Sequence, residues 1–326
     1  MKANSFKVIS VGDLVTDIVI SIPNLPVNAA ENQIVDKIQF EPGGAGNFLI
    51  AGARLDLSMQ SLGVVGNDNF SAAIHDILKS EGVDISSVIK QQDGTTTTVF
   101  VLVDNDGQHV FLGQYGEGPE LTLSNDWKSA LQLADAVQFW GYTLREKRLL
   151  PSFLEAMQFT YNQNRTVFFD PGPYMEAATK DQLKFVLSNS HILLLTDEEL
   201  PHMCCGKTGQ LAVEYLLSSS IKMVCVKHGP KGCSIYTNNE QSHHPGFPVT
   251  ARDTTAAGDS FAAAFIYAYL QKWPLSQISE FSNAMGAAKV EKFGSGRQVP
   301  TAADIFQILS RFNSTLISEF TQDTRN

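Results

Sequence analysis

The chain has 326 residues, of which 43% are hydrophobic and 18% charged, so it can bury a large core and is not a disordered protein. Its formal net charge of −10 and the lack of a basic run argue against a nucleic-acid partner, and no apolar stretch is long enough for a membrane span. The four cysteines form no CxxC pair, which indicates free thiols and a cytoplasmic location.

The first third of the chain is expected to contain both half-exposed and buried elements. Residues 6–12, "FKVISVG", predict a buried strand that ends in a glycine turn. The segments "DIVISIP" and "NQIVDKIQF" alternate apolar and polar residues, as antiparallel strands do. The other elements expected before residue 120 are helices over 47–57 and 69–81, a strand over 59–66, and a hairpin over 96–114 around "DNDG".

After residue 120 the pattern changes to apolar strands separated by helical stretches. The strands are "AVQFWG", "TVFFD", "HILLL" and "KMVCVK", and three helices near 257–271, 275–291 and 302–319 close the chain. This alternation predicts an α/β fold with a doubly wound, mostly parallel sheet flanked by helices. We expect one domain over residues 1–326, with a small antiparallel β lid formed from about 14–40 and 95–115. In such sheets, ligands bind beyond the carboxyl ends of the strands.

The most specific motif is "DTTAAGDSF", residues 253–261, which precedes an apolar and therefore buried helix. Its small residues allow a ligand to approach the backbone amides of Ala256, Ala257, Gly258 and Asp259, where the positive end of the helix favours an anion such as phosphate. An ordinary helix cap at Thr254 or Thr255 would also explain the turn. The same helix terminus is expected to lower the pKa of Asp259.

This motif resembles the C-terminal signature of the ribokinase-like (PfkB) family of small-molecule kinases. The resemblance implies that Ala256, Ala257 and Gly258 form an anion hole for the transferring phosphoryl group and that Asp259 is the base for the substrate hydroxyl. Many relatives have glycine where this chain has Ala256. Phosphoryl transfer depends mainly on positioning and charge stabilisation, so such a set of groups suffices.

A second motif, "EPGGAGNFLIAGARL", resembles the N-terminal signature of the same family, although Leu49 and Asp56 depart from it. The resemblance implies that Gly43, Gly44 and Asn47 bind substrate hydroxyls; a plain helix start with closely packed glycines is the alternative. Asp13 and Asp17 follow the first strand, at the edge where ligands bind in this architecture. Asp17 matches an aspartate that holds a substrate hydroxyl in relatives, while Asp13 could simply form an Asx turn.

The nucleotide side is implied by three further segments. In "LLLTDEEL", Glu199 matches a glutamate that organises Mg²⁺ in relatives, and Thr196 replaces their asparagine; the same pair can form a capping box. In "VCVKHGPKGC", Lys227 would face the phosphates and Gly229 and Gly232 would shape the turn over the nucleotide. The resemblance adds Asn283 on the adenine side, and Asp253 and Thr255, with the loop around Gly294, as a site for a monovalent cation such as K⁺.

Taken together, these motifs predict an ATP- and Mg²⁺-dependent kinase that phosphorylates a hydroxyl, expected to be a primary CH₂OH, of a small sugar or sugar-like molecule. The alternatives are a nucleoside kinase and, from a different class, a catalytically silent sugar-binding regulator. Relatives dimerise through their lids, so a homodimer through apolar lid positions is also expected; these positions are Val99, Val101, Val110 and Leu112.

Overall fold

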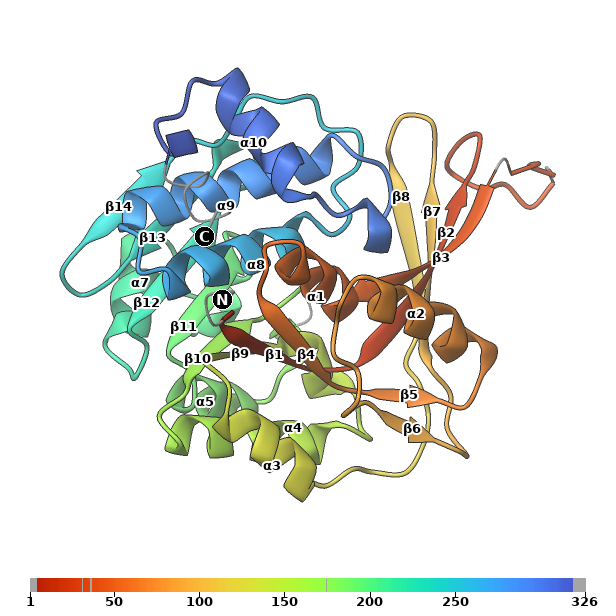
Figure 1. Cartoon of the computed structure of the whole chain (residues 1–326), viewed down its shortest axis with the longest axis horizontal. Coiled ribbons are helices and arrows are strands. Elements are labelled where there is room, and N and C mark those ends of the chain that lie inside the picture. Colours follow the sequence, from red (N-terminus) through yellow and green to blue (C-terminus); the bar gives the residue numbers. More distant parts are fainter. Residues whose placement is uncertain (1–4, 31, 36, 174, 319–326) are drawn as a thin grey trace.

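A large sheet forms the middle layer of the molecule, which the computed structural model describes for residues 5–30, 32–35, 37–173 and 175–318 (Figure 1). Within these residues, eight strands pair in the order β14-β13-β12-β11-β10-β9-β1-β4. The six strands from β12 to β4 are parallel, as predicted, and β13 and β14 extend the sheet in antiparallel pairing. The strands are β1 (Lys7–Val11), β4 (Ser58–Leu62), β9 (Ala136–Trp140), β10 (Thr166–Asp170), β11 (Ile192–Thr196), β12 (Met223–Lys227), β13 (Cys233–Tyr236) and β14 (Gln241–His244).

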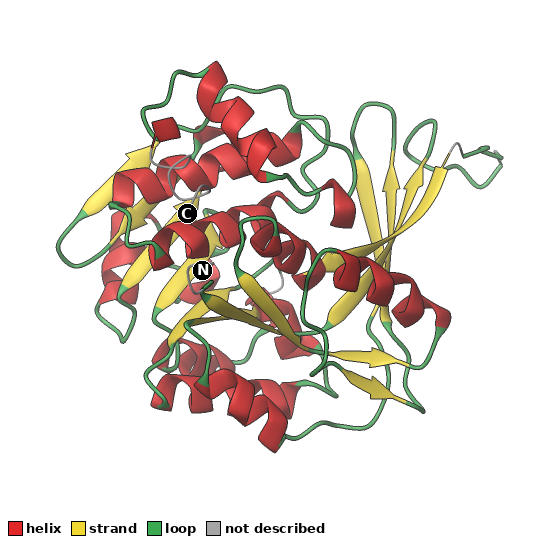
Figure 2. Ribbon diagram, in the orientation of Figure 1, coloured by secondary structure: helices red, strands yellow, loops and turns green. Residues whose placement is uncertain are grey.

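Helices cover both faces of this sheet (Figure 2), because successive strand residues point to opposite sides and both sides are apolar. On β10, for example, Phe168 joins one core and Phe169 the other. The first core is closed by α1 (Ala45–Ala53), α2 (Asn69–Ser80), α8 (Ala257–Leu270), α9 (Leu275–Val290) and α10 (Ala302–Arg311). The second is closed by α3 (Asn125–Gln132), α4 (Leu150–Asn162), α5 (Lys180–Ser188), α6 (Leu200–Met203) and α7 (Gly209–Leu217).

A smaller sheet projects from this body and contains the segments predicted to form a lid (Figure 1). Its strands lie in the order β3 (Lys37–Gly44), β2 (Leu14–Ser21), β7 (Thr97–Val103) and β8 (His109–Gln114). The pairs β2–β3 and β7–β8 are antiparallel, but β2 and β7 are parallel. The prediction of a wholly antiparallel sheet was therefore wrong at this pair, because the long crossover between β2 and β7 permits parallel pairing.

The two faces of the small sheet differ. Val101 is fully buried and packs with Val19 and Val103 against Phe293, on the side that faces the body. Val110 and Leu112 lie exposed. The apolar lid positions named from the sequence therefore do not form one surface, because neighbouring residues of a strand alternate between its faces.

Other element boundaries also differ from the prediction. The strand predicted over 59–66 is two strands, because β5 (Val64–Gly66) leaves the large sheet after Gly63 and pairs with β6 (Ile89–Gln91). The last helix, α10, ends at Arg311, and Asn313 then takes a left-handed φ of 54°, so the helix does not reach the predicted end. Residue 319, that predicted end, lies outside the described residues. All four cysteines are free, as predicted, and none of the described helices could cross a bilayer.

Candidate active site

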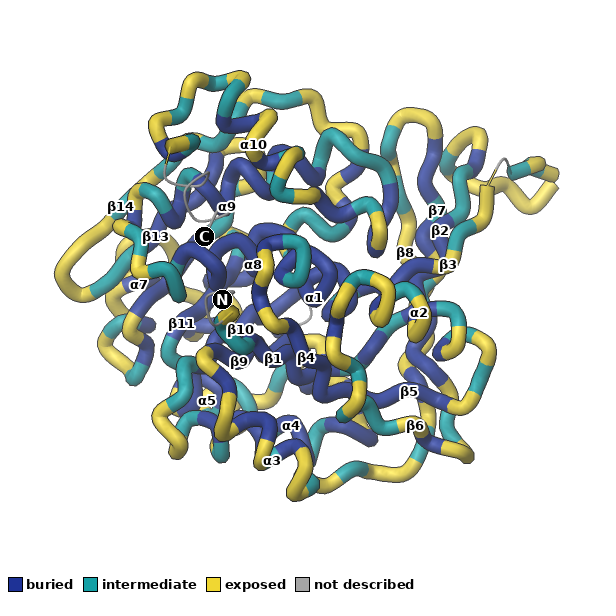
Figure 3. Tube along the Cα trace, in the orientation of Figure 1, coloured by how far each residue is buried: buried dark blue, intermediate teal, exposed yellow. Residues whose placement is uncertain are grey.

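The turn before α8 has the open geometry that its small residues predict. The N-cap residue is Ala256, with a left-handed φ of 63°, and no side chain caps the helix, so the alternative of a threonine cap was wrong. Gly258 is exposed, and Ala256 and Ala257 are half-buried, whereas α8 from Ser260 to Ala268 is buried (Figure 3). The positive end of a buried helix therefore opens at an accessible turn, which favours an anion.

Asn47 links the two signature motifs. Its Nδ2 donates a hydrogen bond to Asp259 Oδ2 at 2.9 Å, and its Oδ1 accepts one from the backbone N–H of Gly296 at 2.6 Å. Asn47 lies at the start of α1, which packs along α8. A side chain that the sequence associated with substrate hydroxyls is thus also the group that orients the predicted base.

Burial, rather than the helix terminus, decides the pKa of Asp259. Burial raises this pKa to about 7, and the hydrogen bond from Asn47 lowers it less than burial raises it. The Asp170 carboxylate raises it further, against Lys227 and Lys289. The expectation of a lowered pKa was therefore wrong, because the side chain loses more hydration than one helix end returns.

Asp17 and Gly43 meet on the inner side of the small sheet. A Cβ atom at Gly43 would collide with the Asp17 carboxylate, so only glycine allows this close approach. Burial raises the pKa of Asp17 to about 7, opposed by the nearby Ser295 hydroxyl and reinforced by the charges of Asp259 and Glu41. Asp17, Asp259 and Asn47 therefore share one region, as the sequence predicted.

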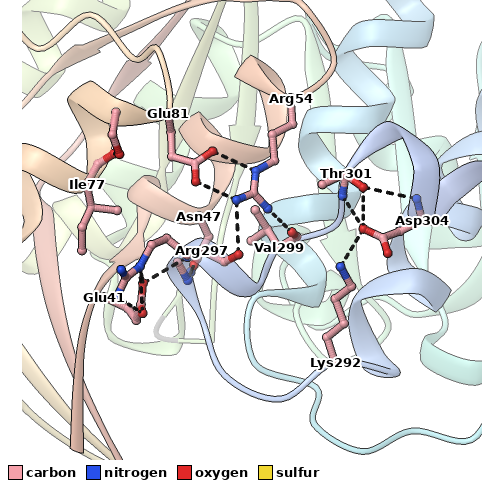
Figure 4. Close-up of polar contacts among 12 residues, drawn as sticks. Glu41, Asn47, Arg54, Ile77, Glu81, Lys292, Arg297, Val299, Thr301 and Asp304 are labelled. Atoms are coloured by element: carbon pink, nitrogen blue, oxygen red, sulfur yellow. Dashed lines mark hydrogen bonds and ion pairs between the residues drawn. The ribbon is translucent and has the colours of Figure 1, made fainter.

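Glu41 holds this region to the loop before α10 (Figure 4). Its buried carboxylate pairs with Arg297, with Nη2 2.8 Å from Oε1. Arg54 reaches the same loop, where it donates to the carbonyls of Val299 and Arg297 and pairs with Glu81 at 2.7 Å. None of these residues was singled out from the sequence, since each needs a partner more than 25 positions away.

Asp13 is built into a buried ion-pair network. Its carboxylate accepts hydrogen bonds from the Thr97 hydroxyl and from Arg148 Nη2, the latter at 3.2 Å, and Arg148 Nε lies 3.4 Å from Glu146 Oε1. Burial raises the pKa of Asp13 to about 7, against the opposing charge of Arg148. Both carboxylate oxygens thus have partners inside the protein, which gives Asp13 a structural role in joining β7 to the body.

The ends of three neighbouring strands bring charged groups to the same edge. Lys227, at the end of β12, lies 2.7 Å from Asp170 Oδ2 at the end of β10. A Cβ atom at Gly258 would be 3.8 Å from Lys227 Nζ, so this ammonium group borders the turn. Glu199, just after β11, accepts a hydrogen bond from the Thr196 N–H at 2.8 Å and donates its own N–H to the Thr196 hydroxyl, but α6 starts later, with Glu199 as its N-cap, so this pair does not cap the helix.

These groups also influence one another's charge. The pKa of Lys227 is raised because the carboxylates of Asp170 and Glu199 together outweigh its burial, the largest single effect. The pKa of Glu199 is raised mainly by burial and then by Asp170, against Lys227. Asp170 was missed in the sequence, although its place at the end of the apolar strand "TVFFD" marks it as a ligand-edge residue.

The family model of the pfkB family carbohydrate kinases matches residues 5–302 of the chain. The chain belongs to this family. It is 31% identical over 312 residues to the ATP-dependent ribose-1-phosphate kinase of Halopiger xanaduensis, covering 93% of this chain and 98% of that protein. It is 27% identical to the nucleoside kinase of Methanothermobacter thermautotrophicus, covering 94% and 95% of the two chains.

The fold also matches that of a putative ribokinase II from E. coli in complex with ATP and Mg²⁺. The TM-score is 0.81 at 23% identity, over 94% of this chain and 99% of the other. The protein is therefore a pfkB kinase, a phosphotransferase with an alcohol acceptor that uses ATP to phosphorylate a sugar or a nucleoside. Membership of this family allows the exposed turn before α8 and the charged strand ends to be interpreted chemically.

The charged edge of this pfkB kinase fits Mg²⁺ held partly by nucleotide phosphates. Among the described residues, no group of three or more Asp, Glu, His or Cys side chains is placed to hold a metal by itself. Mg²⁺ commonly needs only one or two carboxylates, because water and phosphate complete its coordination. Glu199 and Asp170 supply carboxylates of this kind, and Glu199 is the residue that the resemblance implied.

The remaining nucleotide-side residues lie in the turn between β12 and β13 and on α9. Gly229 and Gly232 bound a 3₁₀ turn, and a Cβ atom at Gly232, where φ is 88°, would collide with the carbonyl of His244. Asn283, on α9, donates to that same carbonyl at 3.2 Å. The turn and the asparagine are thus joined through β14, while their contact with a nucleotide stays a prediction.

Asp253 ties the turn before α8 to the loop around Gly294. Its Oδ1 accepts from the Thr255 N–H at 2.8 Å and its Oδ2 from the Gly294 N–H at 2.6 Å. The segments named from the sequence as a monovalent-cation site are therefore brought together. Both carboxylate oxygens of Asp253 already have backbone partners, so the side chain links the two segments. We call this link the clasp.

Proposed function

We propose that this pfkB kinase transfers the γ-phosphoryl group of ATP to a primary hydroxyl of a small sugar, with Asp259 as the base. The carrying observation is the hydrogen bond between Asn47 and Asp259 at the mouth of an uncapped buried helix. It places an oriented carboxylate beside backbone amides that can bind a phosphoryl group. A base with a pKa of about 7 is well matched to proton removal at neutral pH.

The roles of the other groups follow from where they lie. The amides of Ala257, Gly258 and Asp259 stabilise the negative charge of the transferring group, and Lys227 approaches the same charge from the side of β12. Asp17, beside Gly43, accepts hydrogen bonds from substrate hydroxyls. Glu199 and Asp170 would hold Mg²⁺, which when bound would neutralise phosphate charge.

The polar, acidic lining around Asp17 favours a sugar as the acceptor. The side chains facing that region are Asp17, Glu41, Asn47 and Ser295, which suit hydroxyl groups better than an aromatic base. The small sheet, through β2 and β3, brings Asp17 and Gly43 to this region, so we assign it the role of a lid that limits the access of water to ATP.

The test is an ADP-release screen with purified protein, ATP and Mg²⁺ over ribose, ribose 1-phosphate, fructose and nucleosides. We expect a sugar or sugar phosphate to give the highest kcat/KM, and Asp259→Asn to lower its turnover by about a thousandfold or more while folding normally. A nucleoside as best acceptor would overturn the substrate class. Binding of a sugar without ADP release above the Asp259→Asn background would instead support a silent regulator.

A homodimer through the outer face of the small sheet is the oligomer we propose. Across the sheet, Phe40, Ile18, Phe100 and Leu112 lie in one row, and the next row contains Ile38 and Val110. Five of these side chains are exposed, namely Ile38, Phe40, Phe100, Val110 and Leu112, with Leu112 57% exposed. A continuous apolar face of this kind is stabilised when a second copy covers it.

A further inference from the structure

Lys289 is a buried charged side chain to which the proposed mechanism assigns no role. It lies in the last turn of α9 and is 0% exposed. Its Nζ donates a hydrogen bond to the carbonyl oxygen of Lys292 at 3.2 Å. Burying an ammonium group costs several kcal/mol unless opposite charge compensates it. The surroundings of Lys289 must therefore supply negative charge.

Among the charges that act on Lys289, the one that favours its ammonium form most is Asp253, which ties the turn before α8 to the loop at Gly294. Burial lowers the pKa of Lys289 to about 8, against attraction by Asp253 and, more weakly, by Asp259; the nearby Lys292 adds to the lowering. Asp253 is itself buried, and the backbone N–H groups of Arg252 and Asp253 both donate to the carbonyl of Val290, next to Lys289. The negative end of α9 faces the same place.

The groups around Lys289 are those that a monovalent cation would use. The carbonyl of Lys292 accepts the hydrogen bond of Lys289, the Asp253 carboxylate attracts its charge, and Asp253 in turn binds the backbone of Gly294. In addition, the Thr255 hydroxyl is buried and makes no hydrogen bond within the described residues, so an oxygen suited to a cation lies in the same clasp. Lys292 does not compete, because its own ammonium pairs with Asp304 at 2.6 Å (Figure 4).

We propose that Lys289 is a tethered cation beneath the anion hole, which replaces a bound monovalent ion and makes this kinase independent of K⁺. This inference rests on the proposed function in one respect: the positive charge of Lys289 is taken to support the turn that binds the phosphoryl group. Lys289 is a positioning residue in this scheme, because it acts through Asp253 and the turn and not on the substrate.

Two variants separate the charge of Lys289 from the space that it fills. Lys289→Met keeps most of the volume and removes the charge, whereas Lys289→Ala removes both and leaves room for an ion. Each protein is titrated with KCl at constant ionic strength, held with tetramethylammonium chloride. The two readouts are the unfolding temperature and kcat for ADP release with the best acceptor.

We expect neither readout of the wild-type protein to depend on K⁺. Lys289→Met should lose about tenfold or more in kcat, with no recovery in K⁺, because it has neither charge nor space. Lys289→Ala should gain a saturable dependence on K⁺ in both readouts, because the ion restores the missing charge.

Three results would overturn the proposal: a saturable rise of the wild-type unfolding temperature or kcat with K⁺, a Lys289→Met protein with unchanged kcat, or a folded Lys289→Ala protein that ignores K⁺. The wild-type titration decides the matter even if a variant does not fold. The unfolding temperature needs no substrate, so failure of the proposed function remains distinguishable from failure of this inference.

Discussion

The hydrogen bond from Asn47 to Asp259 makes a quantitative prediction about pH dependence. The kcat/KM profile of the wild-type kinase should rise with pH and reach half its plateau at about 7, where Asp259 ionises. Asn47 donates to the carboxylate and so stabilises its charged form. Replacing it in Asn47→Ala should therefore raise the pKa of Asp259 and move the rise in kcat/KM to higher pH.

The size of the shift follows from the geometry. A hydrogen bond to a charged group contributes about 1.5–3 kcal/mol, and one pKa unit corresponds to about 1.4 kcal/mol. Because the neighbouring Gly258 is exposed, water can replace part of the lost bond, and we expect a shift of about one pH unit. At pH 7, kcat/KM should fall about fivefold, and the loss should largely disappear at alkaline pH.

The assay is coupled ADP release at low acceptor concentration, with Mg²⁺ in excess so that ATP stays chelated throughout. Asp259→Asn gives the background rate at each pH. The charges of Asp17 and Asp259 repel each other, so Asp17→Asn is the comparison variant and should move the midpoint of whatever activity remains in the opposite direction, to lower pH. The reasoning is refuted if Asn47→Ala leaves the midpoint in place or moves it to lower pH.

Four further predictions test other parts of the structure. The folded-state pKa of Asp17 is raised to about 7, so the stability that its protonated form contributes is lost as pH rises from about 4 to 7. Asp17→Asn should therefore raise the free energy of unfolding at pH 8, by at most about 4 kcal/mol. A urea titration that shows no gain at pH 8 would contradict this. Ala256→Gly should relieve the left-handed φ of 63° and stabilise the fold by up to about 1 kcal/mol with kcat retained, whereas a lower unfolding temperature would disprove the strain. Lys227→Met leaves the Asp170 carboxylate without its partner, so we expect a loss of about 3 kcal/mol in stability and a higher KM for MgATP; an unchanged KM would remove Lys227 from the nucleotide site. Leu112→Glu should give monomers by light scattering while the wild-type protein dimerises, and a wild-type monomer would exclude the proposed interface.

Local patterns predicted most of the fold correctly. The parallel strands were found because their apolar runs are bounded by turns, and α8 because it is long and almost uniformly apolar. The parallel pairing of β2 with β7 was not found, since strand pairing across a long crossover leaves no local signal. The end of α10 was missed for the opposite reason, because Asn313 ends it locally while apolar residues continue beyond it.

The parts of the candidate site that lie within one sequence motif could be predicted. The parts formed by two residues far apart in the sequence could not. The turn at 256–259 combines small residues with an acid, so it can be recognised by itself. Asp170 with Lys227 and Glu41 with Arg297 can be recognised only as pairs, which are separated in the sequence by 57 and 256 residues. Lys289 gives no signal in the sequence, because only its burial makes its charge unusual.

The raised pKa of Asp259 explains how, in the proposed reaction, the turn before α8 can interact with both the phosphoryl group and the acceptor hydroxyl. A helix terminus stabilises a nearby negative charge by at most about 2 kcal/mol, which is under two pKa units, whereas burial of a carboxyl group shifts its pKa by up to about 3–5 units. Burial therefore prevails, and Asp259 keeps enough proton affinity to accept the proton of a hydroxyl at neutral pH. Asn47, a side chain from another helix, lowers this pKa through its hydrogen bond to the carboxylate. No side chain caps α8, so in the proposed mechanism its first amides are available for the phosphoryl group, while Asp259, in the first turn of the same helix, would act as the base.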